Sequence, residues 1–376
     1  MKRREFLAGS LALGACSPVP SSFAQESVSP EGLAAHARRS GRYFGAAVKS
    51  DQLRDDPGFA AAVARECDIL VEEYELKRGT TERWPGKYDF SGADQIIAFA
   101  QQHGMRARGH ALVWYAAQPQ WLEPALQQAD RAGREKLMTS YIDVAMPRYA
   151  GKIGEWDVVN EAIEPNDGRA DGLRAKSMWL DALGEEYIDI AFHRAKEVDP
   201  HPLRFLTDFG MEQDSPRCER RRTAFLKLLD RLMARNVPVD AIGIQGHLTP
   251  YKEKFDQTVF ARFLEQLNGY GVALAVTEFD IADRGGPPSP DKRDREVASV
   301  AKAFLDVALD NPAMRSVLCW GLSDRYSWLS NYPDYKWPDG QLSRGLPLDG
   351  GMRRKALWDA VASAFDTAPP MGRSRA

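Results

Sequence analysis

Eight short apolar runs rich in β-branched and aromatic residues recur along the chain, and amphipathic segments separate them. The runs span residues 43–48, 68–72, 105–114, 154–160, 203–207, 241–245, 273–277 and 316–320. The amphipathic segments are clearest at 93–103, 185–198, 224–236, 259–270 and 296–309. Strands that alternate with helices predict a parallel sheet covered by helices, and eight strands close a (β/α)8 barrel. The sequence therefore predicts an α/β fold, a single (β/α)8 TIM barrel.

No linker or change of composition divides this region, so we expect one domain over residues 41–365. Residues 25–40 are expected to form a linker and first helix, and residues 366–376 a flexible tail. Within the domain, two glycines and two prolines follow one another inside 283–295, which we interpret as a long loop.

Residues 1–24 have the features of an export signal. A basic start precedes an apolar run at 6–15, which is shorter than the roughly 20 residues that span a bilayer. The pair Arg3-Arg4 resembles a twin-arginine signal. A second interpretation is a lipobox ending at Cys16, which would then carry a lipid anchor and provide a membrane tether. We expect a periplasmic or secreted protein, with an outer-membrane lipoprotein as the alternative.

The net charge argues against a nucleic-acid partner, and the cysteine spacing argues against a metal site. The chain has 50 basic and 53 acidic side chains, a net charge of −3, so no cationic excess is available to neutralise nucleic-acid phosphates. Cys67, Cys218 and Cys319 lack the spacing of metal ligands and are expected to be buried free thiols. We expect no metal site and no nucleic-acid partner.

Two predicted strands end in glutamate. Glu161 follows the fourth strand directly and Glu278 the seventh, so both side chains are expected at the carboxyl-terminal mouth of the barrel, where such folds carry their chemistry. A single glutamate after a strand is commonly a solvated loop residue. Two at opposed strand ends match the pair of carboxyl groups that cleaves a glycosidic bond. One protonates the leaving oxygen. The other, ionised, attacks the sugar carbon or stabilises the positive charge that develops on it.

Aromatic, amide and imidazole groups mark the other strand ends. Trp114 ends the third strand, Trp320 the eighth, and Gln245 and His247 the sixth. Aromatic faces stack on sugar rings, and amide and imidazole groups bond hydroxyls. His110 and His247 show none of the zinc-binding spacings. These residues favour a carbohydrate site over a metal site, although a lone tryptophan or histidine is commonly a core residue.

Five motifs in chain order resemble those of glycoside hydrolase family 10, the retaining endo-β-1,4-xylanases. They read RGHALVW at 108–114, WDVVNEA at 156–162, GIQGH at 243–247, VTEFDI at 276–281 and WGLSD at 320–324. The resemblance runs from about residue 43 to residue 361. It implies the barrel fold, hydrolysis of β-1,4-xylosidic bonds in xylan by double displacement, and no cofactor. We expect a monomer.

The resemblance also implies a role for each matching residue. Glu161 would be the acid/base and Glu278 the nucleophile. Asn160 would hold the nucleophile and a sugar hydroxyl, and His247 would keep Glu278 ionised, with Gln245 beside it. The remaining residues expected to bind substrate are Glu73, Lys77, His110, Trp114, Trp320 and Trp328.

Three positions depart from the family pattern. Tyr74 stands where the family has asparagine, and Tyr115 where it has histidine in Trp-His-x-Gln. After the fifth strand, Phe209-Gly210 replaces Tyr-Asn. Each lost hydrogen bond to a sugar hydroxyl is worth roughly 0.5–1.5 kcal/mol. A decorated xylan or a β-glucan therefore remains an alternative substrate, and a non-catalytic envelope protein that binds glycans is a second alternative.

Overall fold

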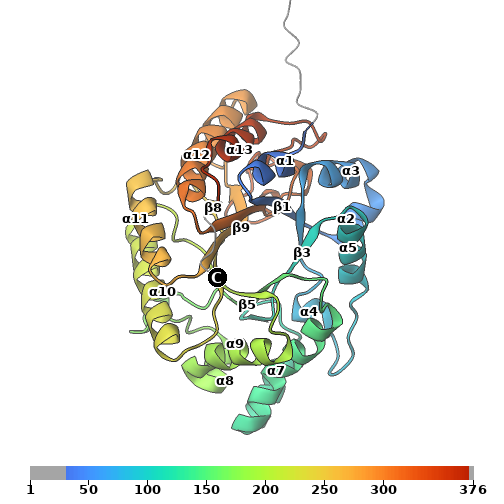
Figure 1. Cartoon of the computed structure of the whole chain (residues 1–376), viewed down its shortest axis with the longest axis vertical. Helices are drawn as coiled ribbons and strands as arrows, with labels where there is room; N and C mark the ends of the chain where they lie inside the picture. The colour runs from blue at the N-terminus through green and yellow to red at the C-terminus, as the bar shows by residue number, and fades with distance from the viewer. Residues whose placement is uncertain (1–30, 372–376) are drawn as a thin grey trace, which may run out of the picture. The chain divides into compact units, whose positions relative to one another are not determined.

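The computed structural model describes residues 31–371, and its centre is a closed barrel of eight parallel strands (Figure 1). Strand β10 pairs with β1 as well as with β9, which closes the sheet and confirms the predicted (β/α)8 barrel. The barrel strands are β1 (Tyr43–Val48), β2 (Ile69–Glu72), β3 (Arg106–Gly109), β5 (Glu155–Asn160), β6 (Leu203–Asp208), β7 (Ala241–Ile244), β9 (Ala273–Ile281) and β10 (Met314–Cys319).

The helices form a ring outside the strands (Figure 1). Several begin where the sequence supplies a cap: Asp130 and Ser215 each accept a hydrogen bond from the backbone N–H three residues later. The helices are α1 (Leu33–Arg39), α2 (Ser50–Asp55), α3 (Pro57–Glu66), α4 (Arg78–Thr81), α5 (Ser91–Gln102), α6 (Leu122–Gln128), α7 (Arg131–Arg148), α8 (Met178–Leu183), α9 (Tyr187–Val198), α10 (Pro216–Ala234), α11 (Gln257–Asn268), α12 (Pro290–Asp310) and α13 (Ala356–Thr367).

Two helices begin earlier than the sequence pattern indicated. α10 starts at Pro216 rather than at residue 224, and α12 starts at Pro290 inside the segment interpreted as a loop. In both, proline occupies the first helical position, where its missing N–H costs nothing. The charged first turns of both helices hid their periodicity, so the interpretation of 290–295 as loop was wrong.

The carboxyl-terminal boundary also differs from the prediction. α13 continues to Thr367, and Asp366 accepts hydrogen bonds from the His36 and Arg39 side chains. Beyond the helix, the Pro369 carbonyl accepts a hydrogen bond from buried Arg42. The predicted flexible tail therefore does not begin at residue 366.

The predicted export signal at residues 1–24 lies outside the described residues and stays a prediction. Among residues 31–371, no helix combines the length and the apolar character needed to cross a bilayer. Cys67, Cys218 and Cys319 are buried free thiols, as expected.

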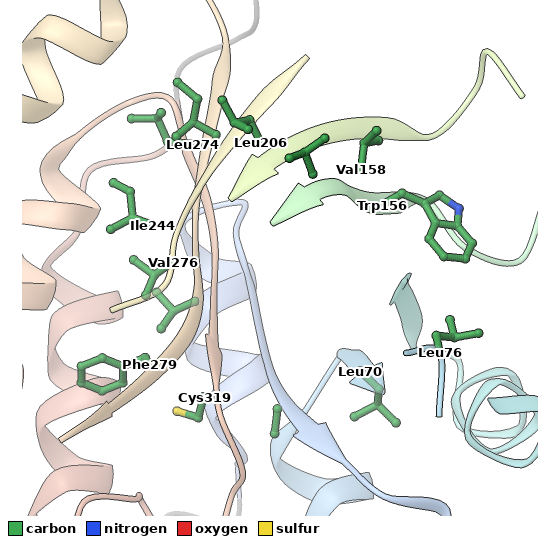
Figure 2. Close-up of a cluster of buried hydrophobic side chains, with 14 of the residues drawn as sticks. Leu70, Leu76, Trp156, Val158, Leu206, Ile244, Leu274, Val276, Phe279 and Cys319 are labelled. Atoms are coloured by element: carbon green, nitrogen blue, oxygen red, sulfur yellow. The ribbon is translucent and has the colours of Figure 1, made fainter. Parts of the chain in front are cut away.

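The main hydrophobic core lies between the barrel and its helices. Figure 2 shows side chains from neighbouring strands in this layer, among them Val158, Leu206 and Phe279, which are fully buried. Burying a side chain of this size contributes about 1.5–3 kcal/mol. The inside of the barrel holds only small apolar clusters, such as Phe205 with Ala241 and Ala275, and is otherwise polar.

Two barrel strands carry one extra residue shortly before their carboxyl ends. In β5, Asp157 pairs with Phe205 but Val159 pairs with Leu206, so Val158 is additional. In β9, Val276 and Phe279 pair with residues of β10 that are one position closer together. Because side chains alternate along a strand, one extra residue reverses which side chains face the barrel interior. These are the two strands that lead to Glu161 and Glu278.

A buried network of charges fills the barrel interior below the strand ends. Arg108 of β3 donates to Glu155 at 2.9 Å and to Asp157 at 2.5 Å, both on β5. Asp157 also bonds His110 at 3.0 Å and accepts from the Thr207 hydroxyl of β6. Burial alone would raise the pKa of Asp157, but Arg108, His110 and Thr207 outweigh it and lower this pKa to about 2. The network ties three adjacent strands together.

Replacing Arg108 with leucine should strongly destabilise the protein. Arg108→Leu leaves the Glu155 and Asp157 carboxylates buried without their cation, which typically costs about 3–5 kcal/mol. We expect chemical denaturation to report a loss of this size in the free energy of unfolding. Arg106→Leu, on the same strand but exposed, is the control and should cost about 1 kcal/mol or less. Equal losses in the two variants would contradict this account.

Candidate active site

Glu161 and Glu278 line one cleft at the carboxyl-terminal mouth of the barrel. Glu161 follows the last residue of β5, and Glu278 lies in the carboxyl-terminal half of β9. The cleft has a volume of about 450 Å³. Both side chains are largely buried, with 13% of Glu161 and 6% of Glu278 exposed. Two carboxyl groups in one sugar-sized cleft can supply an acid and a nucleophile to the same bond.

Two short strands at the barrel mouth place further site residues in register. β4 (Val113–Trp114) pairs with β5 and sets Trp114 opposite Asn160. β8 (His247–Leu248) pairs with β9 and sets His247 opposite Asp280. The sequence predicted one continuous strand over 105–114, whereas the structure has β3 and β4 with a break between them. The break lets β4 pair with the end of β5.

Glu278 is held by a chain of hydrogen bonds. His247 Nε2 lies 3.3 Å from Glu278 Oε2, and His247 Nδ1 lies 2.8 Å from Asp280 Oδ1. Trp328 Nε1 donates to the other Asp280 oxygen at 2.6 Å. Burial alone would lower the pKa of His247, but Asp280 and Glu278 outweigh it and raise this pKa well above 6.5. Asp280 and Glu278 therefore favour the imidazolium form of His247, which places a positive charge beside the Glu278 carboxylate.

Glu161 has a different set of partners. Its backbone φ of 58° lies in the left-handed region, which costs a residue with a side chain about 1–3 kcal/mol. Arg174 donates to the Glu161 carbonyl at 2.9 Å, and Gln245 donates to the carboxylate Oε1 at 3.1 Å. Asn160 lies 3.4 Å from the same oxygen. The amide of Asn160 therefore contacts Glu161, whereas the resemblance implied a contact with Glu278.

Three of the other predicted binding residues, Lys77, Trp114 and Trp320, lie together on one side of the cleft. Lys77 lies over the ring of Trp114, with its nitrogen 4.7 Å from the centroid, and 5.6 Å from that of Trp320. Burial lowers the pKa of Lys77, and the carboxylates of Glu278, Glu73 and Glu161 oppose this shift. Lys77 thus lies within electrostatic reach of both candidate catalytic groups.

Glu73 and His110 complete this side of the cleft. Glu73 pairs with Lys49 at 3.2 Å, and burial raises the pKa of Glu73. His110 bonds Asp157 below the cleft and packs edge-on against Trp320, with 5.1 Å between ring centroids and 70° between ring planes. All eleven residues predicted from the sequence thus lie at or directly beside the cleft.

The cleft wall also holds residues that the sequence analysis did not select. Tyr332 and Tyr335 follow Trp328 in the loop after β10, and their rings stack with centroids 5.5 Å apart. The aromatic-rich stretch at 328–337 was the available signal. Arg174 was also missed, because nothing in its neighbouring sequence shows that it folds back onto Glu161.

The described residues offer no group of three histidine, cysteine or carboxylate side chains placed to hold a metal ion. The polar groups at the mouth of the barrel instead bond one another or face the cleft. The arrangement suits a reaction that needs proton transfer and a carboxylate nucleophile.

Comparison with known proteins identifies the family. The model of glycosyl hydrolase family 10 matches residues 32–364. A β-1,4-xylanase of Dictyoglomus thermophilum is 34% identical over 305 residues, which cover 78% of this chain and 80% of that protein. The chain belongs to glycosyl hydrolase family 10. The predicted family, and with it a retaining glycoside hydrolase of the endo-1,4-β-xylanase type, is confirmed.

Solved structures agree with this assignment to family 10. Xylanase 10B from Thermotoga maritima superposes with a TM-score of 0.80 at 26% identity, covering 89% of this chain and 98% of that one. Xylanase 10B from Thermotoga petrophila RKU-1 in complex with xylobiose has a TM-score of 0.79 at 26% identity, covering 94% of this chain and 99% of that one.

Asp280 should control the charge of His247 in this family 10 enzyme. Asp280→Asn removes the neighbouring negative charge that contributes most to raising the pKa of His247, so this pKa should fall toward its ordinary range. In the wild type, NMR of ¹⁵N-labelled histidine should find that His247 keeps its proton well above pH 6.5. In the variant, the same ring should lose its proton at lower pH. Identical titration in the two proteins would contradict the proposed ion pair.

Proposed function

We propose that this enzyme is an endo-1,4-β-xylanase that hydrolyses xylan with retention of configuration. The observation that carries the proposal is that Glu161 and Glu278 line one cleft and have different hydrogen-bond partners. Glu278 faces the imidazolium of His247, and Glu161 accepts a hydrogen bond from the neutral amide of Gln245. The xylanases among its relatives support xylan as the substrate.

Glu278 is the nucleophile in this proposal. Its Oε2 is held by His247, while its Oε1 is buried and has no hydrogen-bond partner among the described residues. A buried carboxylate oxygen without a partner is available to attack the anomeric carbon. The positive charges of Lys77 and of the His247 imidazolium lie beside the attacking carboxylate.

Glu161 is the acid and then the base. In the first step it gives its proton to the glycosidic oxygen while Glu278 forms a covalent glycosyl-enzyme. In the second step Glu161 takes a proton from water, and the water oxygen displaces Glu278 from the sugar. Two inversions at the anomeric carbon give net retention. The rings of Trp114, Trp320 and Trp328 provide apolar faces for the sugars.

Tyr74 favours a second candidate substrate, a decorated xylan or a β-glucan. Its side chain lines the cleft and is 49% exposed, and the Lys49 and Lys77 nitrogens lie 4.9 and 4.6 Å from its ring centroid. A phenol in place of a small amide changes the shape and the hydrogen bonding of the sugar site. Export across the membrane rests on residues 1–24 alone and stays a prediction.

The two glutamates should differ in their response to the leaving group. Glu161→Ala should lower activity on xylan by about 10²–10⁴-fold, the usual contribution of a general acid or base. It should spare bond cleavage in an aryl xylobioside whose phenol leaves without a proton. Glu278→Ala should abolish both reactions. Stopped-flow release of the activated phenol measures this step, and near wild-type release by Glu278→Ala would refute the assignment.

The substrate proposal is tested by products and rates on purified polysaccharides. We expect xylan to yield a ladder of short oligosaccharides early in the reaction, as internal cleavage requires. ¹H NMR should show the β-anomer first. Matched assays on arabinoxylan and mixed-linkage glucan test the second candidate substrate. A faster initial rate on glucan than on xylan, or release of the α-anomer first, would overturn the proposal.

A further inference from the structure

We propose that Arg174 and Tyr115 form a positioning pair that fixes Glu161 in the geometry needed for proton transfer. This inference rests on the proposed role of Glu161 as acid/base. Arg174 is a positioning residue rather than a catalytic one, because its contacts are with Glu161 and the cleft wall. Tyr115 is one of the positions at which this chain departs from its family.

Arg174 contacts Glu161 in two ways. Its Nε donates to the Glu161 backbone carbonyl at 2.9 Å, and its Nη2 lies 3.9 Å from the carboxylate Oε2. The same nitrogen donates to the Ile163 carbonyl at 3.3 Å. Carbonyls on both sides of residue 162 are therefore tied to one rigid guanidinium. This arrangement holds the left-handed backbone of Glu161 and the direction in which its side chain leaves it.

Tyr115 fixes the guanidinium in turn. The carbon centre of the guanidinium lies 4.0 Å from the centroid of the Tyr115 ring, a close stacking distance for arginine on an aromatic face. Tyr115 is itself braced at right angles by Trp114, with ring centroids 5.7 Å apart. The Arg174 side chain is only 9% exposed, so water competes little for these contacts. A histidine at position 115 would offer a smaller ring to the cation.

The second oxygen of the Glu161 carboxylate completes the clamp. Gln245 donates to Oε1 at 3.1 Å, while Arg174 faces Oε2. Gln245 also bonds the side chain of Asn160 at 3.2 Å, so its amide is held in place. Glu161 is thus fixed at its backbone and at both oxygens. Removing Arg174 frees the backbone and one oxygen but leaves the Gln245 contact.

A displaced acid has a recognisable kinetic signature. When Glu161 is well placed, its proton compensates for a poor leaving group, so kcat/KM depends weakly on the acidity of the departing phenol. When Glu161 is displaced, poor leaving groups slow sharply and good ones do not. A change that only weakens folding or substrate binding lowers all these rates by a similar factor.

The test measures kcat/KM for aryl β-xylobiosides whose phenols differ in acidity. For Arg174→Gln we expect a loss of about 10- to 100-fold with phenol as leaving group, which is part of the 10²–10⁴-fold that a general acid contributes. With dinitrophenol the loss should stay below about threefold. Arg174→Lys keeps a positive charge and a donor, and it should recover part of the phenol rate.

The role of Tyr115 is tested by a pair of variants. Tyr115→Phe keeps the ring face on the guanidinium and should retain the wild-type dependence on the leaving group. Tyr115→Ala removes the ring and should steepen this dependence in the same direction as Arg174→Gln. If Arg174→Gln does not fold, this pair decides the question, and equal dependence in the Phe and Ala variants overturns the proposal.

Arg204→Gln is the matched control. Arg204 is also buried, with 6% of its side chain exposed, and donates to backbone carbonyls, but it lies near the start of β6, at the other end of the barrel. It should change thermal stability without changing the dependence on the leaving group. A uniform loss across all leaving groups in Arg174→Gln overturns this inference. If Glu161→Ala also lacks a steep dependence, the proposed role of Glu161 fails as well.

Discussion

The site depends on the hydrogen bonds and the ion pair that the Asp157 carboxylate makes inside the barrel. Asp157 lies on β5, the strand that leads to Glu161. It bonds Arg108 of β3, His110 after β3 and Thr207 of β6. A buried carboxylate without these partners would be strongly unfavourable, so the three strands can adopt only the arrangement that brings the partners together. His110 is positioned by this network and in turn packs against Trp320 in the cleft wall. The floor of the cleft is therefore fixed from below by charge.

The two extra residues in β5 and β9 solve a geometric problem. Strict alternation from Asp157 would turn Asn160 away from the barrel interior, because three positions separate them. The additional residue Val158 restores Asn160 to the interior face, opposite Thr207. The additional residue between Val276 and Phe279 lets Phe279 pack in the outer core while Glu278 and Asp280 reach the cleft. In both strands the extra residue changes the direction of the following side chains, so that a carboxylate at the strand end faces the cleft where a substrate would bind.

Glu161 and Glu278 have the same side chain, and their different surroundings suit them to different proposed roles. Glu278 lies beside His247, whose imidazolium form is favoured by Asp280 and places a positive charge next to this carboxylate. Glu161 accepts from the neutral amide of Gln245 and is held at its backbone by Arg174, an arrangement that fixes direction. The proposed roles of nucleophile and acid/base follow from this difference. Tyr74 and Tyr115, two departures from the family pattern, line the same cleft as this pair.

The sequence by itself determined the (β/α)8 barrel, because the alternation of strands and helices is a local property of the chain. It also predicted eleven site residues from their positions at strand ends and from motifs, and these lie at or beside one cleft. It did not determine the starts of α10 and α12, whose charged first turns carry no apolar period. Only the tertiary structure placed Arg174 on Glu161 and stacked Tyr332 with Tyr335 in the cleft wall. Each contact lies within one irregular loop, after β5 for Arg174 and Glu161 and after β10 for the two tyrosines. Such a loop has no periodicity from which a contact could be predicted. The bulges were equally hidden, since a single extra residue is visible only when the partner strand fixes the register.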